Sequence, residues 1–438
     1  MSRLPNRLPV IKYLGSKRLL IPYIEGIVAT LPGTRPPHTA PPPRHSPARG
    51  SAKASQDGKP VRAVARREPK RLPGKSGVRT ACDLFAGTTR VGQALKRMGL
   101  SVISNDTACY SEVFGRCYIE ADATRIAVSE VKEVLRELGS LPARAGYFTE
   151  TFCIRSRFFQ PANGARIDAV REGIDEMNLA EPMRSIALTS LIEAADRVDS
   201  TTGLQMAYLK EWAPRSGQPL ELRVPKLIPG TGQVFREDAS ELVKRLPPVD
   251  LLYLDPPYNQ HSYFSNYHIW VSLVRNDRPE VYGKARKRVD CRTTKSRYNF
   301  RKGCLSALAD VVRQARARFL IVSFNDEGFV PRDELEAVLS ERGEVVRLDI
   351  PYKRYVGAQI GIYNPKGERV GEVSHLTNTE HLFVVGEGVT DLASQWDFVP
   401  ARTSQEPSPS LKPWIGKGLK PLAGPGCLTR QGGVDSGG

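Results

Sequence analysis

The sequence lacks the patterns that mark several common classes of protein. Its seven cysteines form no Cys-x-x-Cys pair and its histidines do not cluster with them, so we expect reduced thiols, no disulfide framework and no metal site. No apolar run approaches the length of a membrane-spanning helix, and residues 1–10 contain no apolar leader segment. We therefore expect a cytoplasmic protein that does not contact a membrane.

A complete dinucleotide-binding motif is also missing. Residues 80–89 predict a strand and a glycine turn, followed by a helix over residues 90–98, but the turn does not contain Gly-x-Gly-x-x-Gly. The incomplete motif argues against a nucleotide-dependent oxidoreductase, but it is compatible with a smaller cofactor that contains adenosine. Asp106 follows the next expected strand, residues 101–105, about 20 residues after the turn, where an acidic side chain takes ribose hydroxyls in nucleotide sites.

Positive charge is in excess, with 64 Lys and Arg against 47 Asp and Glu, which makes nucleic acid the first candidate partner. Residues 31–78 carry eleven of the basic residues and two acidic ones, a net +9 of the total +17. Their prolines and scarce apolar side chains predict a disordered basic insert. The Pro-, Ser- and Gly-rich residues 391–438 predict a disordered tail.

The strongest candidate for a catalytic site is the stretch of residues 249–258. Five of its first six residues are apolar and predict a buried parallel strand, which Asp255-Pro256-Pro257-Tyr258 ends. Two consecutive prolines fix the backbone just beyond the carboxyl end of the strand, where ligands bind in open α/β sheets. A carboxylate and a ring held there suit a planar base that carries an amino group. The alternative is a turn in which Asp255 only caps and Tyr258 only packs.

The remaining pattern predicts an α/β fold in which a helical module interrupts a Rossmann-like sheet. The βα alternation lapses from about residue 141, where residues 167–177 and 183–198 have helical spacing, and resumes after residue 230. Residues 344–350 and 380–385 are expected to pair as a closing hairpin. The predicted divisions are a first segment at residues 1–30, the insert at 31–78, one half of the sheet domain at 79–140, the helical module at 141–230, the other half of the sheet domain at 231–390 and the tail at 391–438.

Residues 284–302 form the densest basic stretch that reads as ordered. They hold nine Lys and Arg against one acid, Asp290, with Tyr298 and Phe300 interleaved. Basic residues with aromatic rings near the catalytic edge suit a surface that follows a nucleic-acid backbone, whereas a solvated charged loop would not need the rings. The residues expected to contact DNA are Arg286, Lys287, Arg288, Lys295 and Arg297.

Together these stretches resemble a known family, the Dam-like, D12 class of DNA adenine-N6 methyltransferases. The resemblance follows the family's order of motifs and is carried by residues 11–17, residues 83–88, Asp106, Asp238 and residues 255–258. It leaves out the insert and the tail. Two features depart from the family pattern, because the insert separates the first motif widely from the glycine turn and the module, taken as a target-recognition module, matches no sequence specificity.

The resemblance implies that S-adenosyl-L-methionine is the cofactor. The residues implied to bind it are Lys12, Gly15, Lys17, Asp83, Phe85, Gly87, Asp106 and Asp238. The first three would line its methionine end, and the next three would hold its amino group and close against it. Asp106 would take the ribose hydroxyls and Asp238 the adenine ring, while Phe85 is equally consistent with a place in the core.

The expected chemistry needs neither a metal nor a covalent intermediate. Hydrogen bonds from the adenine amino group to Asp255 and to a carbonyl of the proline corner would localise the nitrogen lone pair and aim it at the sulfonium methyl group. The target base must leave the duplex, so Tyr258 would stack on a flipped adenine.

Several alternatives stay open at this point. The same chemistry suits cytosine N4 in DNA or adenine N6 in RNA, and a non-catalytic DNA-binding protein could use the same fold. No nuclease-like carboxylate cluster is present, so we expect no cleavage activity. The expected partner is double-stranded DNA, with a cognate restriction endonuclease as a candidate second partner. We expect a monomer that associates with the nucleoid when bound to DNA.

Overall fold

The computed structural model describes residues 17–33, 77–353, 362–363, 369–371, 377–394, 396 and 399–400. Lys12, Gly15 and most of the expected insert and tail lie outside these residues. No helix in the described part of the chain is long and apolar enough to cross a membrane.

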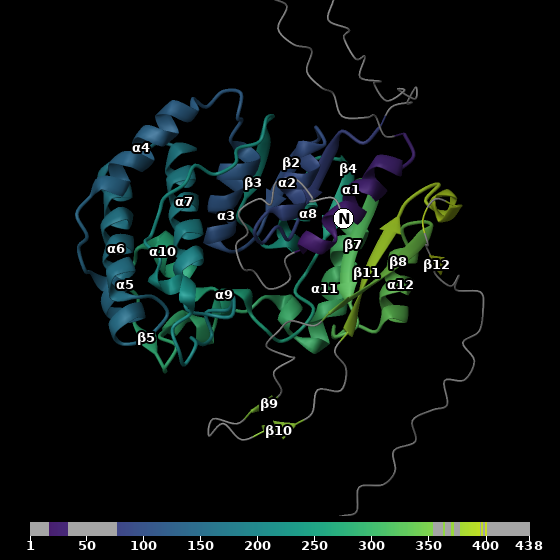
Figure 1. Cartoon of the computed structure of the whole chain (residues 1–438). Helices are drawn as coiled ribbons and strands as arrows, with labels where there is room; N and C mark the ends of the chain where they lie inside the picture. Colours follow the sequence, from purple (N-terminus) through teal and green to yellow (C-terminus); the bar gives the residue numbers. More distant parts are fainter. Residues whose placement is uncertain are drawn as a thin grey trace, which may run out of the picture. The chain divides into compact units, whose positions relative to one another are not determined.

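The central sheet (Figure 1) is built from β1 (Thr80–Asp83), β2 (Ser101–Asn105), β3 (Gly232–Phe235), β4 (Val249–Leu254), β7 (Ala317–Asn325), β8 (Val345–Lys353), β11 (Thr377–Val385) and β12 (Val399–Pro400). Their spatial order is β3-β2-β1-β4-β7-β11-β8-β12. Neighbours run parallel from β3 to β7, and β11 is antiparallel to both β7 and β8. The predicted Rossmann-like α/β sheet is confirmed, and the predicted closing hairpin is the antiparallel pair β8–β11.

Helices cover both faces of this sheet. They include α1 (Ile21–Thr30), α2 (Arg90–Arg97), α3 (Cys109–Gly115), α8 (Ala239–Arg245), α11 (Arg301–Gln314) and α12 (Arg332–Ser340). Leu251 and Ile321 enter one hydrophobic cluster with α1, α2 and α3, whereas the next residues, Leu252 and Val322, enter another with α8, α11 and α12. Burial on both faces explains why β4 and β7 have nearly continuous apolar sequences.

A helical module accompanies the sheet and contains α4 (Val128–Ser140), α5 (Tyr147–Thr149), α6 (Pro161–Glu176) and α7 (Met183–Val198). The last two correspond to the predicted helices. An unpredicted helix, α10 (His268–Arg275), joins this group (Figure 1), because Arg171 of α6 donates to the carbonyl of Leu273 at 2.6 Å. The chain after the Asp-Pro-Pro-Tyr corner therefore also contributes to the module, together with the hairpin β5 (Val281–Tyr282) and β6 (Lys287–Arg288).

Candidate active site

A cavity of about 340 Å³ lies at the carboxyl ends of the parallel strands. Three aspartates in its wall come from neighbouring strand ends, since Asp83 ends β1, Asp106 follows β2 and Asp255 follows β4. The rest of the wall includes Tyr263 and the consecutive residues 294–299. The sheet edge thus brings together carboxylates that are far apart in the sequence, as its topology requires.

The turn after β1 is held by the carboxylate of Asp106. Gly87 has a φ of 52°, a left-handed conformation that favours glycine. Its backbone N–H donates to Asp106 Oδ2 at 2.9 Å, and the N–H of Ala108 donates to Oδ1 at 2.9 Å. Burial raises the pKa of Asp106, although these hydrogen bonds oppose the rise. The predicted glycine turn and the predicted acidic residue are therefore one bonded unit.

Asp83 presents a buried carboxylate oxygen to the site. Its Oδ2 accepts a hydrogen bond from the N–H of Gly92 at 3.0 Å, whereas its Oδ1 has no hydrogen-bond partner among the described residues. Burial raises the pKa of Asp83 to about 7, and the nearby Asp255 and Asp106 add to the rise. An unpartnered buried oxygen is costly, so this position fits a ligand that brings a positively charged donor.

Asp255 is bound by a lysine from the start of the described chain. Lys17 Nζ lies 3.0 Å from Asp255 Oδ1 and also contacts Glu380 Oε1, which accepts a hydrogen bond from Ser323 Oγ at 2.6 Å. Burial lowers the pKa of Lys17, but the two carboxylates outweigh it and hold the pKa well above its ordinary value. Burial raises the pKa of Asp255 to about 7 against the opposing effect of Lys17.

Glu380 is a site residue that no sequence motif marks. In the sequence it is only the first residue of an expected strand. Its place beside Lys17 depends on the register of β11, which pairs Glu380 with Asn325 of β7 and with Ile350 of β8. Sequence alone offers one signal, a carboxylate within an otherwise buried strand, because such charges are seldom buried unless paired.

The two prolines and the tyrosine of the corner occupy different positions. Pro257 lies in the cavity wall with Asp255, whereas Pro256 is buried and neither it nor Tyr258 is among the described lining residues. The half-buried Tyr258 ring lies beside the wall, 5.9 Å from Lys17 Nζ and edge-on to Phe324 at 5.8 Å. Tyr263 and Phe264, a few residues after the corner, lie in the wall itself.

Phe85 and Asp238 also line the cavity. Phe85 lies edge-on to Tyr298, with ring centroids 5.1 Å apart. Asp238 caps α8, since its Oδ1 accepts from the N–H of Ser240 at 2.9 Å. Of the predicted cofactor residues, the structure therefore brings Lys17, Asp83, Phe85, Gly87, Asp106 and Asp238 into one cavity wall.

Comparison with known proteins assigns the chain to a family. The family model described as D12 class N6 adenine-specific DNA methyltransferase matches residues 69–302. The chain belongs to this family. The type II methyltransferase M.NlaIII of Neisseria lactamica is 30% identical over 305 residues, which are 67% of this chain and 89% of the relative.

Two other relatives are longer than the region they share with this methyltransferase. The modification methylase StsI of Streptococcus sanguinis is 31% identical over 291 residues, 62% of this chain and 44% of the relative. The type II methyltransferase M.FokI of Planomicrobium okeanokoites is 30% identical over 294 residues, 62% of this chain and 45% of the relative.

Methyltransferases of this family use S-adenosylmethionine as the methyl donor. The cavity fits that cofactor on the evidence of Asp83, because its unpartnered Oδ1 suits the ammonium group of the methionine moiety. The wall also suits a cationic ligand, since Asp83, Asp106 and Asp255 all lie in it.

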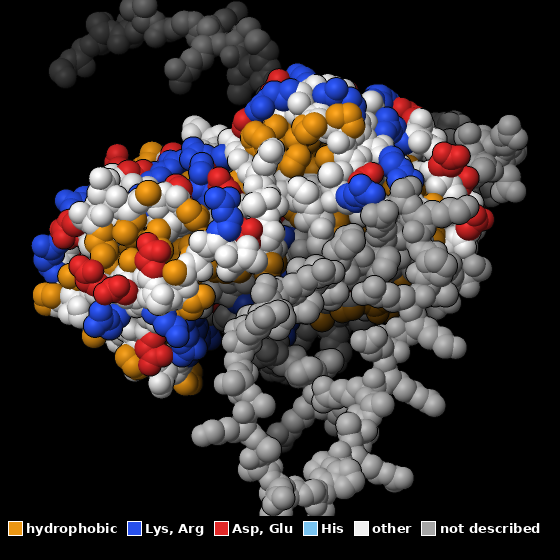
Figure 2. Space-filling view, turned by 90° about the horizontal axis from the view of Figure 1, so that it is seen from above, with side chains coloured by type: hydrophobic (Ala, Val, Ile, Leu, Met, Phe, Trp, Pro, Cys, Tyr) orange, Lys and Arg blue, Asp and Glu red, His pale blue; other side chains and the backbone are white. Residues whose placement is uncertain are grey.

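The basic residues predicted to contact DNA separate into three groups. Lys295 and Arg297 are exposed and lie in the cavity wall. Arg286 and Lys287 are partly exposed in and beside the β5–β6 hairpin, and Arg286 Nε donates to the carbonyl of Arg155 at 3.2 Å. Figure 2 views the molecule from above, the side away from the β5–β6 hairpin in Figure 1, and on that side Lys and Arg side chains lie among Asp and Glu.

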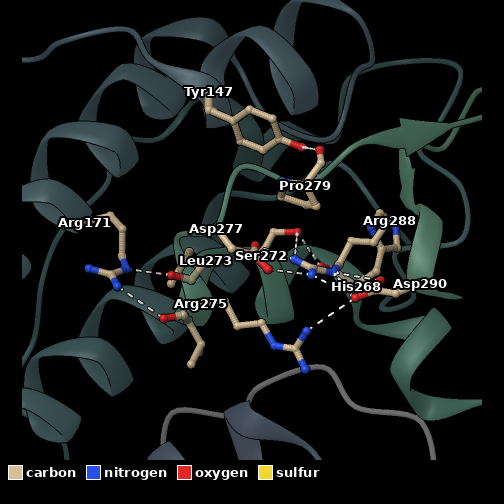
Figure 3. Close-up of polar contacts among 11 residues, drawn as sticks. Tyr147, Arg171, His268, Ser272, Leu273, Arg275, Asp277, Pro279, Arg288 and Asp290 are labelled. Carbon is tan, nitrogen blue, oxygen red and sulfur yellow. Dashed lines mark hydrogen bonds and ion pairs between the residues drawn. The ribbon is translucent and has the colours of Figure 1, made fainter. Parts of the chain in front are cut away.

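The prediction that Arg288 contacts DNA does not fit the structure. Its side chain is 3% exposed, and its guanidinium binds both oxygens of Asp277 at 2.6 Å and Asp290 Oδ2 at 2.9 Å (Figure 3). A guanidinium occupied by two carboxylates does not reach a phosphate. Arg288 instead ties the hairpin to the loop that precedes it.

Proposed function

We propose that this methyltransferase acts at a specific sequence in duplex DNA, on the N6 amino group of an adenine flipped into the cavity. The observation that carries the proposal is the arrangement at the end of β4, where Asp255 lies in the same wall as Asp83 and is held by Lys17. A carboxylate so held can orient an amino group toward a methyl donor bound at the neighbouring strand ends.

The cofactor residues keep their expected roles in this proposal. Asp83 Oδ1 accepts from the ammonium group, Asp106 takes the ribose hydroxyls, Asp238 bonds the adenine ring, and Phe85 and Gly87 form walls. When bound, the cofactor supplies the electrophilic methyl group. Lys12 and Gly15 remain assigned to binding the methionine end of the cofactor. Lys17 lines the same cavity, but its contacts with Asp255 and Glu380 support a different role, that of orienting the catalytic carboxylate.

Asp255 has two tasks in the proposed mechanism. Lys17 binds Oδ1, so Oδ2 accepts a hydrogen bond from the adenine amino group, and a carbonyl of the Pro256–Pro257 corner accepts the second. These bonds localise the nitrogen lone pair before transfer. The amino group loses a proton after transfer, and a carboxylate whose pKa is about 7 can hold that proton at Oδ2.

Aromatic side chains receive the flipped base. We assign stacking on the adenine to Tyr258, whose ring is half-buried beside the wall, and we assign the opposite boundary to Tyr263 and Phe264, which lie in the wall. Lys295 and Arg297 in the wall, with Arg286 and Lys287 in and beside the hairpin, would bind DNA phosphates. Removing a base from the stack costs a few kcal/mol, which these contacts offset.

The test is transfer of labelled methyl groups from S-adenosylmethionine to unmodified duplex DNA, followed by digestion to nucleosides. We expect the label in N6-methyladenine, and we expect Asp255→Ala to abolish transfer while DNA binding persists. Label in N4-methylcytosine would change the target base, and label in RNA alone would change the substrate. If no nucleic acid is labelled and no cofactor binds, a binding protein on this fold becomes the better description.

The partners and the location of the protein follow from the same proposal. The names of the relatives describe them as type II methyltransferases and modification methylases, which supports a cognate restriction endonuclease as a partner in the cell. We propose that the protein acts as a monomer in the cytoplasm and is found at the nucleoid when bound to DNA.

A further inference from the structure

Arg275 is a cation in the cavity wall that the proposed mechanism does not use. It is the last residue of α10, and its guanidinium lies 5.6 Å from the ring centroid of Phe264, another wall residue. Its Nη1 lies 3.3 Å from Asp290 Oδ2. Both side chains are partly open to solvent, at 37% and 36% exposed, so this ion pair contributes little to stability.

Asp290 has a second and better partner. Arg288 donates from Nε to Asp290 Oδ1 at 3.0 Å and from Nη2 to Oδ2 at 2.9 Å, and it is almost fully buried. Figure 3 shows Arg275 and Arg288 converging on this one carboxylate from different elements. If Arg275 leaves, Asp290 keeps the bonds to Arg288, so no unpaired buried charge results.

The cavity wall also contains the cations Lys295 and Arg297. Both are exposed, and among the described residues neither forms an ion pair with a carboxylate. The wall therefore contains cations as well as the aspartates of the strand ends, and Lys17 among them is bound to Asp255. An anion that accompanies a ligand into this cavity could therefore meet Arg275 in the wall.

We propose that Arg275 binds the DNA phosphate next to the flipped adenine and exchanges Asp290 for that phosphate when the base enters the cavity. The proposal rests on the proposed function, because it presumes a flipped nucleotide. A guanidinium can bind a phosphate through two parallel hydrogen bonds, which exceeds the single long contact that Arg275 makes with Asp290. Arg288 remains in place throughout and keeps the β5–β6 hairpin attached to α10.

The experiment is a cycle of protein and DNA changes. The methylated sequence is first mapped on plasmid DNA treated with the wild-type protein, and duplexes of that sequence are then made with a neutral methylphosphonate on either side of the target adenine. The value of kcat/KM is measured on each duplex for the wild type, Arg275→Gln and Arg292→Gln. Arg292 is the matched control, because it is exposed and lies over the Tyr282 ring at 4.3 Å but is not a wall residue.

We expect one methylphosphonate to lower kcat/KM of the wild type about 10- to 100-fold, the scale of one hydrogen bond to a charged group. Arg275→Gln should lose a similar factor on unmodified DNA and almost nothing more on the modified duplex. Arg292→Gln should respond to the modification as the wild type does. Thermal unfolding of both variants shows whether either substitution has disturbed the fold.

The proposal would be overturned if Arg275→Gln and the methylphosphonate each lowered kcat/KM by its own factor and the combination lowered it by the product of the two factors. An Arg275→Gln variant whose KM for S-adenosylmethionine rises while its response to DNA is unchanged would also overturn it, because Arg275 would then bind the cofactor carboxylate. Failure of the proposed function is distinguishable from both outcomes, since the wild type itself would then methylate no DNA in the mapping step.

Discussion

The ammonium group of Lys17 lies 3.0 Å from Asp255 Oδ1, and the same ammonium group contacts Glu380. One cation thus joins the first turn of the described chain to the corner after β4 and to a strand near the end of the sheet domain. Lys17 thereby holds Asp255 at one oxygen, and the orientation of this carboxylate depends on residues that are far from it in the sequence.

Glu380→Gln should lower kcat about 10- to 100-fold without preventing folding, because Lys17 loses one of its two anionic partners. Glu380 also raises the pKa of Asp255, so removing its charge lowers that pKa. The acidic limb of the pH–rate profile should therefore move to lower pH. Glu387→Gln, an exposed position just beyond β11, is the control and should change neither quantity. A Glu380→Gln profile that coincides with the wild type would remove Glu380 from the site.

Asp83 should make cofactor binding depend on pH. Its pKa is about 7 in the cofactor-free protein because of burial, and an ammonium ligand favours the ionised form. Affinity should therefore rise as pH increases toward 7, since below the pKa of Asp83 binding must first displace a proton, and it should fall again above about 8, where the cofactor's amino group loses its charge. Calorimetric titration should show that Asp83→Asn binds weakly with little pH dependence, whereas Asp255→Asn keeps the rise in affinity but moves it to lower pH, because Asp255 no longer raises the pKa of Asp83. Retention of the rise by Asp83→Asn would place the ammonium group elsewhere.

Tyr258 should act through its ring rather than its hydroxyl group. Tyr258→Ala should lower kcat/KM on DNA about 10- to 100-fold, the scale of one lost base–aromatic stack, while Tyr258→Phe keeps most of the activity. Fluorescence of 2-aminopurine at the target position reports base flipping directly. Full activity and normal flipping in Tyr258→Ala would transfer the stacking role to Tyr263 or Phe264.

The basic residues around the hairpin should separate into DNA-binding and structural ones. Replacing Arg286 and Lys287 together by Gln should reduce the slope of log K against log salt by about 1.8, since each phosphate contact contributes about 0.9. Arg288→Gln should instead lower the free energy of unfolding by about 2–3 kcal/mol, because it leaves Asp277 and Asp290 without their shared partner. Fluorescence anisotropy across salt concentrations and chemical denaturation measure the two effects. An unchanged slope in the double variant would move the DNA surface away from the hairpin.

The parts of the site that depend on local pattern were predictable from the sequence. The apolar run of β4 and the two prolines after it define a strand end, and the glycine turn and Asp106 mark two more. Parallel strands in one sheet present such ends at the same edge, so the meeting of Asp83, Asp106 and Asp255 follows from the fold class.

The contacts that depend on long-range register were not predictable. Glu380 reaches Lys17 only because β11 enters the sheet antiparallel between β7 and β8. Arg288 was expected at the surface because its neighbours in sequence are basic. The burial of Arg288 depends on its ion pair with Asp277, which lies before the hairpin in the sequence. No sequence pattern indicated that Asp277 and Arg288 would pair.

The position of β11 has a consequence for the order in which the enzyme is assembled. A nascent chain leaving the ribosome can complete β1, β2, β4 and β7 early, yet the slot beside β7 stays open until β11 has been synthesised. Lys17 precedes all of these strands in the chain, yet it meets its second carboxylate, Glu380, only after β11 has been added. The contacts that hold Asp255 are therefore complete only once β11 is in place.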